Sequence, residues 1–362
     1  MNAALNVGSS INQLARAIHK VGHKRTVLIE GDMGWGKTSL LKLLAALLPT
    51  HIPLHMDCTT LDIGDLFVPN FKSIEGTGVV SFAPNEALGL HLDQPVILLF
   101  DEIGKGNPAV KNAVMRIMLE REMNGLKLHP DSIVFATTNL GAEGVGDLLQ
   151  AHQRNRITVM RMRKPTGPEW VEWAIQAGLD LSVIAWANDT PQVFHNFSDY
   201  KDPKENAMIY HPLAPERTAF ATGRSMEAAS DWMKEREFMD NQTLRAALTG
   251  TIGAEASSSL YTYYKLGEDL PKLEDIRLNP LEAKIPASAA ALTMVVFKAL
   301  ISMDNKLILP WMKYMRRLNT TAQGLFVNNA RKDKYKQRDL VANTEDYKVW
   351  AKEFGHLFSQ DK

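Results

Sequence analysis

The feature that most constrains the fold is a glycine-rich octapeptide near the N-terminus. Its residues are Gly31, Asp32, Met33, Gly34, Trp35, Gly36, Lys37 and Thr38. They match the phosphate-loop pattern G-x-x-x-x-G-K-[ST], in which glycines let the backbone curl so that N–H groups point at a phosphate chain. A short apolar run at 26–29 precedes the loop, and a helix-forming run from about 37 to 48 follows it. Strand, tight turn and helix in this order predict the opening unit of an α/β fold.

The loop predicts the chemistry of its ligand. We expect residues 31–39, which end at Ser39, to cradle the phosphates of a nucleotide. The ammonium of Lys37 would reach the β- and γ-phosphates, and the hydroxyl of Thr38 would ligate Mg²⁺. ATP and Mg²⁺ are therefore the expected cofactors.

Further apolar runs extend the α/β pattern. The runs at 96–100 and 132–137 do not alternate with polar residues, which is typical of strands buried on both faces of a parallel sheet. Residues 108–120, between them, have helical periodicity, and another strand-like run spans 157–160. Strands that alternate with helices up to about residue 163 predict a parallel sheet covered by helices.

Polar residues follow two of these runs directly. Asp101 and Glu102 come after 96–100, and Asn139 follows the run that begins at Ile133. The carboxyl ends of parallel strands are where α/β sheets bind ligands. We expect Asp101 to hold Mg²⁺ through water and Glu102 to orient and activate the attacking water. Asn139 would hydrogen-bond the γ-phosphate or that water, unless it is an ordinary turn residue.

Composition narrows the class of protein. The 41 basic residues balance 41 acidic ones, which argues against a protein that acts mainly through a basic nucleic-acid-binding surface. A single cysteine, Cys58, excludes an internal disulfide framework and fits a reducing compartment. The first 25 residues lack a secretory signal pattern, and the most apolar stretch, 287–301, is short for a membrane span. We expect a cytoplasmic protein, in a bacterium or a phage-infected host cell.

The three phosphate-site motifs in this order resemble an AAA+ ATPase. The resemblance narrows to the MoxR and dynein-related type at residues 151–157, where that group carries an arginine finger just before a strand. Arg156 matches that position best, and Arg154 is the alternative. Arg224 matches the second-sensor arginine at the start of the lid helix, although Gly223 stands where the group usually has proline. Arg217 is the alternative for that role.

The resemblance also implies an architecture and partners. Residues 1–164 would form the AAA+ αβα core, residues 165–285 a helical lid, and residues 286–362 a helical accessory region. The resemblance covers about residues 5–285, and nothing from about 307 to 362 matches the group. Such proteins form rings, usually hexamers, that remodel a client protein, and many work with a partner that carries a von Willebrand factor A domain. An insert at 71–85 and a hairpin at 123–129, with Asn124-Gly125 as its turn, would face the ring pore.

Two other function classes stay open. A ring motor or loader acting on nucleic acid is favoured by the basic segment 331–338 and disfavoured by the zero net charge. The second open class is a module that binds a nucleotide without hydrolysing it. The presence of Lys37, Asp101 and Glu102 at their motif positions argues against this class. His51, His55 and Cys58 have a spacing that suggests a metal site, but they lie in the predicted second strand and its loop, so we do not assign one.

Overall fold

The computed structural model describes residues 8–74, 76–139, 155–267 and 270–354. The chain divides into two compact units, residues 1–165 and 166–362. The boundary falls in the segment 164–168, whose prolines and glycine predict a linker.

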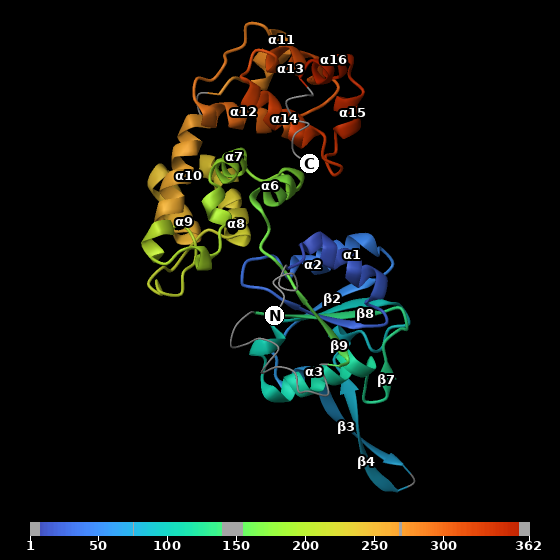
Figure 1. The fold of residues 1–362 in the computed structure, drawn as a ribbon. Coiled ribbons are helices and arrows are strands. Elements are labelled where there is room, and N and C mark those ends of the chain that lie inside the picture. The colour runs from blue at the N-terminus through green and yellow to red at the C-terminus, as the bar shows by residue number, and fades with distance from the viewer. Residues whose placement is uncertain (1–7, 75, 140–154, 268–269, 355–362) are drawn as a thin grey trace. The chain divides into compact units, whose positions relative to one another are not determined.

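The first unit is built on a five-stranded parallel sheet (Figure 1). In sheet order, its strands are β2 (Ile52–Asp57), β5 (Val96–Asp101), β8 (Ile133–Thr138), β1 (Thr26–Glu30) and β9 (Ile157–Arg161). The strands β5 and β8 are fully buried, and β1 nearly so, whereas β2 and β9 at the edges are partly exposed. The apolar runs without alternation are thus the central strands, as predicted.

Helices cover both faces of this sheet. On one face, α1 (Ile11–Val21) and α2 (Ser39–Leu47) pack with Leu14 and Leu44 against side chains such as Ile97 and Phe135. On the other face, α3 (Pro108–Glu120) packs with Val114 against Leu98 and its neighbours. The predicted α/β phosphate-loop fold is confirmed. One difference concerns α2, which begins two residues later than expected, with Thr38 as its N-cap.

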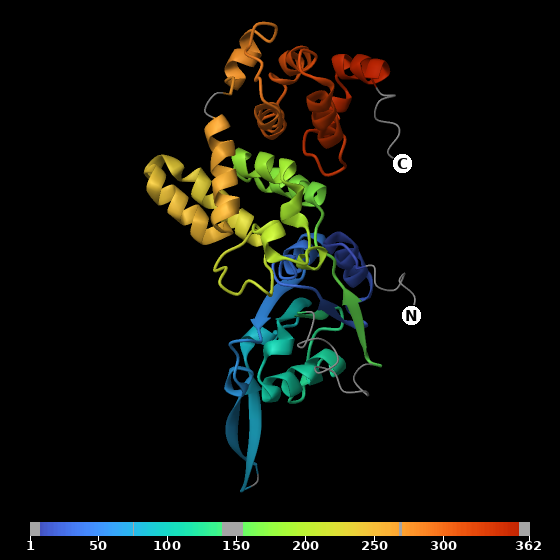
Figure 2. The ribbon, with the colours of Figure 1, turned by 60° about the vertical axis from the view of Figure 1, so that its left-hand side comes forward.

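Two hairpins extend the first unit. The strands β3 (Phe67–Ile74) and β4 (Thr77–Pro84) form an antiparallel hairpin that projects away from the sheet (Figure 2). The shorter hairpin of β6 (Glu122–Met123) and β7 (Leu126–Lys127) turns at Asn124 and Gly125. Both turn residues have positive φ, 53° and 84°, which a type I′ turn requires. The predicted Asn-Gly turn is confirmed.

The described residues of the second unit form helices and the loops between them, without a strand. Its helices are α6 (Gly167–Ala177), α7 (Leu181–Asp189), α8 (Gly223–Lys234), α9 (Asn241–Ile252), α10 (Ala254–Gly267), α11 (Leu273–Leu278), α12 (Ala289–Ile301), α13 (Ile308–Met315), α14 (Thr320–Ala330), α15 (Arg338–Ala342) and α16 (Glu345–Phe354). Short 3₁₀ turns lie in the segment between α7 and α8. None of the helices described is long and apolar enough to cross a membrane.

One hydrophobic cluster runs through this helical unit, from Trp170 in α6 to Trp350 in α16. Helix α12 lies at the centre of this cluster and contacts α7, α10 and α14. Residues on both sides of position 285 therefore share one core. That residues 165–285 act as a lid and residues 286–362 as an accessory region stays a prediction.

Trp350 tests whether the C-terminal helices belong to this core. Its side chain is 1% exposed, and its Nε1 donates to Gln323 Oε1 at 2.6 Å. We expect Trp350→Ala to lower the free energy of unfolding of the helical unit by about 3–5 kcal/mol, because it leaves a cavity and removes the hydrogen bond to the Gln323 amide oxygen. Trp232→Ala, at a residue 43% exposed, is the control and should change it by about 1 kcal/mol or less. Equal effects of the two variants in urea unfolding would contradict this prediction.

Candidate nucleotide-binding site

The phosphate loop lies between the carboxyl end of β1 and the start of α2. Gly34 and Gly36 have φ values of 75° and 90°, in the left-handed region where a side chain is strained. The backbone N–H of Gly31 donates to the carbonyl of Thr138 at 3.2 Å, so the start of the loop is tied to the neighbouring strand β8. The glycines therefore have the conformational role that the motif requires.

Lys37 occupies the centre of the site. Its Nζ is buried and donates to the Gly31 carbonyl and to Asn139 Oδ1, both at 2.7 Å. Glu102 Oε1 lies 3.3 Å from the same nitrogen. Burial lowers the pKa of Lys37, and the negative charge of Glu102 opposes that shift. Three predicted site residues from three segments thus meet at one ammonium group.

Thr38 and Asp101 form the second part of the site. The Thr38 hydroxyl donates to Asp101 Oδ2 at 2.7 Å. Burial alone would raise the pKa of Asp101, but hydrogen bonds from Thr137, Thr38 and His55 outweigh it and hold that pKa below its usual value. Asp101 is therefore ionised at neutral pH. A hydroxyl and a carboxylate oxygen at this distance are hard donors of the kind that Mg²⁺ prefers, so these residues fit the ion.

Glu102 follows β5 in an unusual backbone conformation. Its φ is 52° and its ψ is 38°, which is left-handed and uncommon for a residue with a side chain. The carboxylate lies between two ammonium groups, since Lys105 Nζ approaches Oε2 at 3.3 Å and Lys37 approaches Oε1. This conformation turns Glu102 out of the strand direction and places its carboxylate beside the phosphate loop.

The remaining loop residues differ in exposure. Met33 is 52% exposed, whereas Trp35 is partly buried against the core beneath α1 and α2. Asp32 is partly buried, and burial raises the pKa of its carboxyl although Lys37 and Arg161 oppose the shift. Of these three side chains, Asp32 interacts electrostatically with Lys37.

Sequence reasoning misses two residues of this site. The spacing of His55 suggests only a metal ligand, and the structure places its Nε2 3.3 Å from Asp101 Oδ2. Thr137 reads only as part of a strand, and its hydroxyl contacts both acidic residues. Both residues could be found only from the strand order, which the sequence does not give. In that order β2, with His55, and β8, with Thr137, are the two neighbours of β5. No cluster of three or more metal-ligating side chains occurs among the described residues.

Arg156 lies at the opposite end of the sheet from the phosphate loop. It precedes Ile157, which pairs with Thr26 at the start of β1, whereas the loop follows the end of β1. The four residue steps along β1, from Thr26 to Glu30, span about 13 Å at about 3.3 Å per residue. Its guanidinium is about half exposed and pairs with Glu120 at 2.6 Å. The alternative finger, Arg154, lies outside the described residues.

The two candidates for the second sensor differ in structure. Arg217 donates to the backbone carbonyls of Pro203, Asn206 and Ile209, at 2.5, 3.1 and 3.1 Å, and so ties the loop before α8 together. Arg224 is exposed in the first turn of α8, whose N-cap Thr222 forms a capping box with Ser225. Arg217 thus holds its own loop through three backbone carbonyls, whereas Arg224 is exposed at the start of α8.

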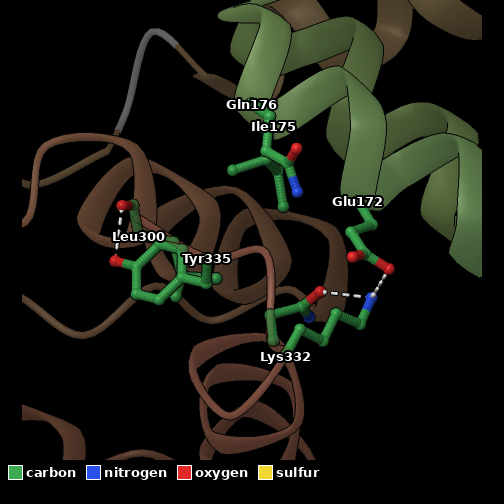
Figure 3. A pocket seen from close by; sticks show the side chains of 7 residues that line it. Glu172, Ile175, Gln176, Leu300, Lys332 and Tyr335 are labelled. Carbon is green, nitrogen blue, oxygen red and sulfur yellow. Dashed lines mark hydrogen bonds and ion pairs between the residues drawn. The ribbon is translucent and has the colours of Figure 1, made fainter. Parts of the chain in front are cut away.

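A small pocket opens in the helical unit. It is lined by Glu172, Ile175, Gln176, Leu300, Asn329, Lys332 and Tyr335. Its polar groups bond to one another, because Lys332 Nζ donates to Asn329 Oδ1 at 3.1 Å and pairs with Glu172, while Tyr335 donates to the Leu300 carbonyl (Figure 3). The pocket contains none of the predicted site residues.

Part of the chain is similar in sequence to a protein whose name describes an ATP-binding subunit. No protein-family model matches the chain. It is 26% identical over 169 residues to an ATP-dependent protease ATP-binding subunit-like protein of Rhodococcus erythropolis, a match that covers 42% of this chain and 47% of that protein. The chain thus spans about half the length of the curated relative it matches. The MoxR type is not confirmed by this similarity.

Solved structures of AAA+ ATPases share low overall similarity with the chain. The RuvB Holliday junction branch migration motor of Thermotoga maritima has a TM-score of 0.37 at 16% identity, covering 75% of this chain and 75% of that one. NtrX of Brucella abortus has a TM-score of 0.32 at 18% identity, covering 71% and 68%. These scores are too low to assign a role to any residue.

Proposed function

We propose that this chain is an Mg-ATP-hydrolysing AAA+ ring ATPase of the MoxR type that remodels a client protein in the cytoplasm. The observation that carries the proposal is the convergence of Lys37, Thr38, Asp101, Glu102 and Asn139 at the carboxyl ends of three central strands. This end of a parallel sheet is where phosphate-loop proteins bind and hydrolyse nucleotides.

Each residue has a defined task in hydrolysis. The loop N–H groups and Lys37 would bind the phosphates, and Lys37 already sits among oxygen atoms that a phosphate chain would replace. Thr38 and Asp101 would hold Mg²⁺, which neutralises charge on the β- and γ-phosphates when bound. Glu102, with its carboxylate beside Lys37, would orient the attacking water and accept its proton. Asn139 would hydrogen-bond the γ-phosphate or the water.

Assembly into a ring would give Arg156 a target. An arginine about 13 Å away along the sheet does not reach the site of its own chain, so its target would be the site of a neighbouring subunit. The exposed Arg224 would complete the site from the lid. A hexamer, and a partner with a von Willebrand factor A domain, follow from the MoxR resemblance.

The β3–β4 hairpin supports contact with another protein. Phe71 is 77% exposed and Val80, its cross-strand partner, is 51% exposed. Large exposed apolar side chains on a projecting hairpin are typical of an interaction surface. We place the client contact there and on Leu126 of the shorter hairpin, which is 41% exposed.

Lys37→Ala tests the nucleotide site. The change removes charge-assisted hydrogen bonds to phosphate oxygens, each of which contributes about 1.5–3 kcal/mol, so we expect ATP to bind at least about 100-fold more weakly. Lys42→Ala, on the exposed face of α2, is the matched control and should leave binding unchanged. Calorimetric titration measures both affinities, and phosphate release by the wild type separates an ATPase from a module that only binds nucleotide. Equal ATP affinity in Lys37→Ala and wild type would remove the site assignment.

The nucleic-acid alternative loses part of its support in the structure. In the basic segment 331–338, Lys332 pairs with Glu172 and Arg338 pairs with Asp333. These pairs reduce the charge that the segment can offer to phosphates. A motor on nucleic acid would show ATPase activity that DNA or RNA stimulates and that falls steeply with salt. We expect neither property.

A further inference from the structure

Thr137 is a buried residue of β8 whose hydroxyl joins both acidic residues of the site. Its Oγ1 accepts the backbone N–H of Glu102 at 3.0 Å and donates to Asp101 Oδ1. The side chain is fully buried. A threonine hydroxyl can donate one hydrogen bond, and here the acceptor of that bond is the Asp101 carboxylate.

The position of β8 explains how one side chain reaches both residues. The strand lies between β5, which carries Asp101, and β1, which leads into the phosphate loop. It pairs with β5 up to Phe100 and Ala136, so Asp101 and Thr137 follow side by side. Because all three strands are buried and hydrogen-bonded on both sides, the hydroxyl is held at a fixed place.

The two hydrogen bonds constrain different atoms. Asp101 uses Oδ1 for Thr137 and Oδ2 for Thr38 and His55, so the rotation of its carboxylate is defined from both sides. Glu102 holds a left-handed backbone conformation, which persists only where surrounding contacts enforce it. The bond from its N–H to Thr137 is such a contact, and it sets the direction in which the carboxylate leaves the strand.

We propose that Thr137 is a positioning residue that aims Asp101 at the metal ion and Glu102 at the attacking water. This role rests on the proposed ATPase function. Partners of this kind, which orient a metal ligand without touching the metal, affect metal affinity or activity by about 10- to 100-fold when removed. Thr137 thus couples Mg²⁺ binding and water activation through one hydroxyl.

The test compares three variants. Thr137→Val keeps the shape and removes the hydroxyl, Thr137→Ser keeps the hydroxyl, and Thr26→Val removes another buried threonine hydroxyl of the same sheet, which donates to the Met118 carbonyl. In Thr137→Val we expect kcat to fall and the Mg²⁺ concentration for half-maximal activity to rise, each by about 10- to 100-fold. Thr137→Ser should stay within about threefold of wild type, because it can make both bonds. Thr26→Val should keep wild-type values.

A second readout does not depend on turnover. Mg²⁺ should strengthen binding of a non-hydrolysable ATP analogue to wild type and Thr26→Val, and it should do so about tenfold less in Thr137→Val. Affinity for the analogue without Mg²⁺ should be equal in all variants. Wild-type Mg²⁺ dependence in Thr137→Val, or a loss in Thr137→Ser as large as in Thr137→Val, would overturn the positioning role. If only the positioning role is wrong, ATP still binds in a way that depends on Lys37. If the wild-type chain binds no ATP, the ATPase proposal and this inference are both wrong.

Discussion

Arg156→Ala is expected to bind ATP with nearly wild-type affinity and to lose hydrolysis by a factor of about 10³ to 10⁵. The guanidinium would stabilise charge that builds on the transferred phosphoryl group in the site of the neighbouring subunit. Its place at the far end of β9 keeps it away from the site of its own chain. Steady-state phosphate release and ATP titration measure the two expected effects.

The fold should survive this substitution. Arg156 pairs with Glu120 on the surface, where both side chains are about half exposed, and such pairs contribute about 0–1 kcal/mol to stability. Glu120→Gln is the matched control, since it breaks the same pair and keeps the arginine. We expect this control to retain hydrolysis, so that loss in Arg156→Ala alone assigns the effect to the guanidinium.

Mixing experiments locate the arginine in the assembly. Arg156→Ala subunits keep an intact nucleotide site, and Lys37→Ala subunits keep an intact arginine, so mixed rings should regain part of the activity. No recovery, in rings shown to contain both subunits, would exclude Arg156 and make Arg154→Ala the next variant. Equal activity of isolated monomers and rings would exclude a finger altogether.

Glu102→Gln is expected to retain ATP and to slow hydrolysis by about 10²- to 10⁴-fold. The amide can hydrogen-bond the attacking water but is a poor base. The change also removes the negative charge 3.3 Å from Lys37, so ATP affinity should stay the same or rise. Single-turnover phosphate release separates this chemical step from binding.

The same variant should accumulate assembled rings, because ATP then persists at the subunit junctions. Sedimentation with ATP measures this. Glu120→Gln again serves as the control for the same chemical change at the other end of the sheet. If Glu102→Gln hydrolyses ATP at the wild-type rate, another group activates the water, and the role assigned to this carboxylate is wrong.

Short sequence patterns were enough to predict much of the fold of the first unit. The phosphate loop, the buried runs that became β5 and β8, and the Asn124-Gly125 turn each depend on a few consecutive residues. Backbone sterics and burial act at that range, since glycine alone readily tolerates the loop conformation and strands buried on both faces lose their polar alternation. For the same reason Lys37, Thr38, Asp101 and Glu102 could be named from their motifs.

The tertiary structure decided which of these segments meet. Sheet order put β8 between β5 and β1, and only this order brings Thr137 to both acidic residues and Asn139 to Lys37. It likewise brought β2, and with it His55, beside Asp101. Strand order depends on how helices cover both faces of the whole sheet, which no short run of residues encodes. The chain's own sequence thus determined the chemistry of the site, and packing across the sheet determined the contacts that aim it.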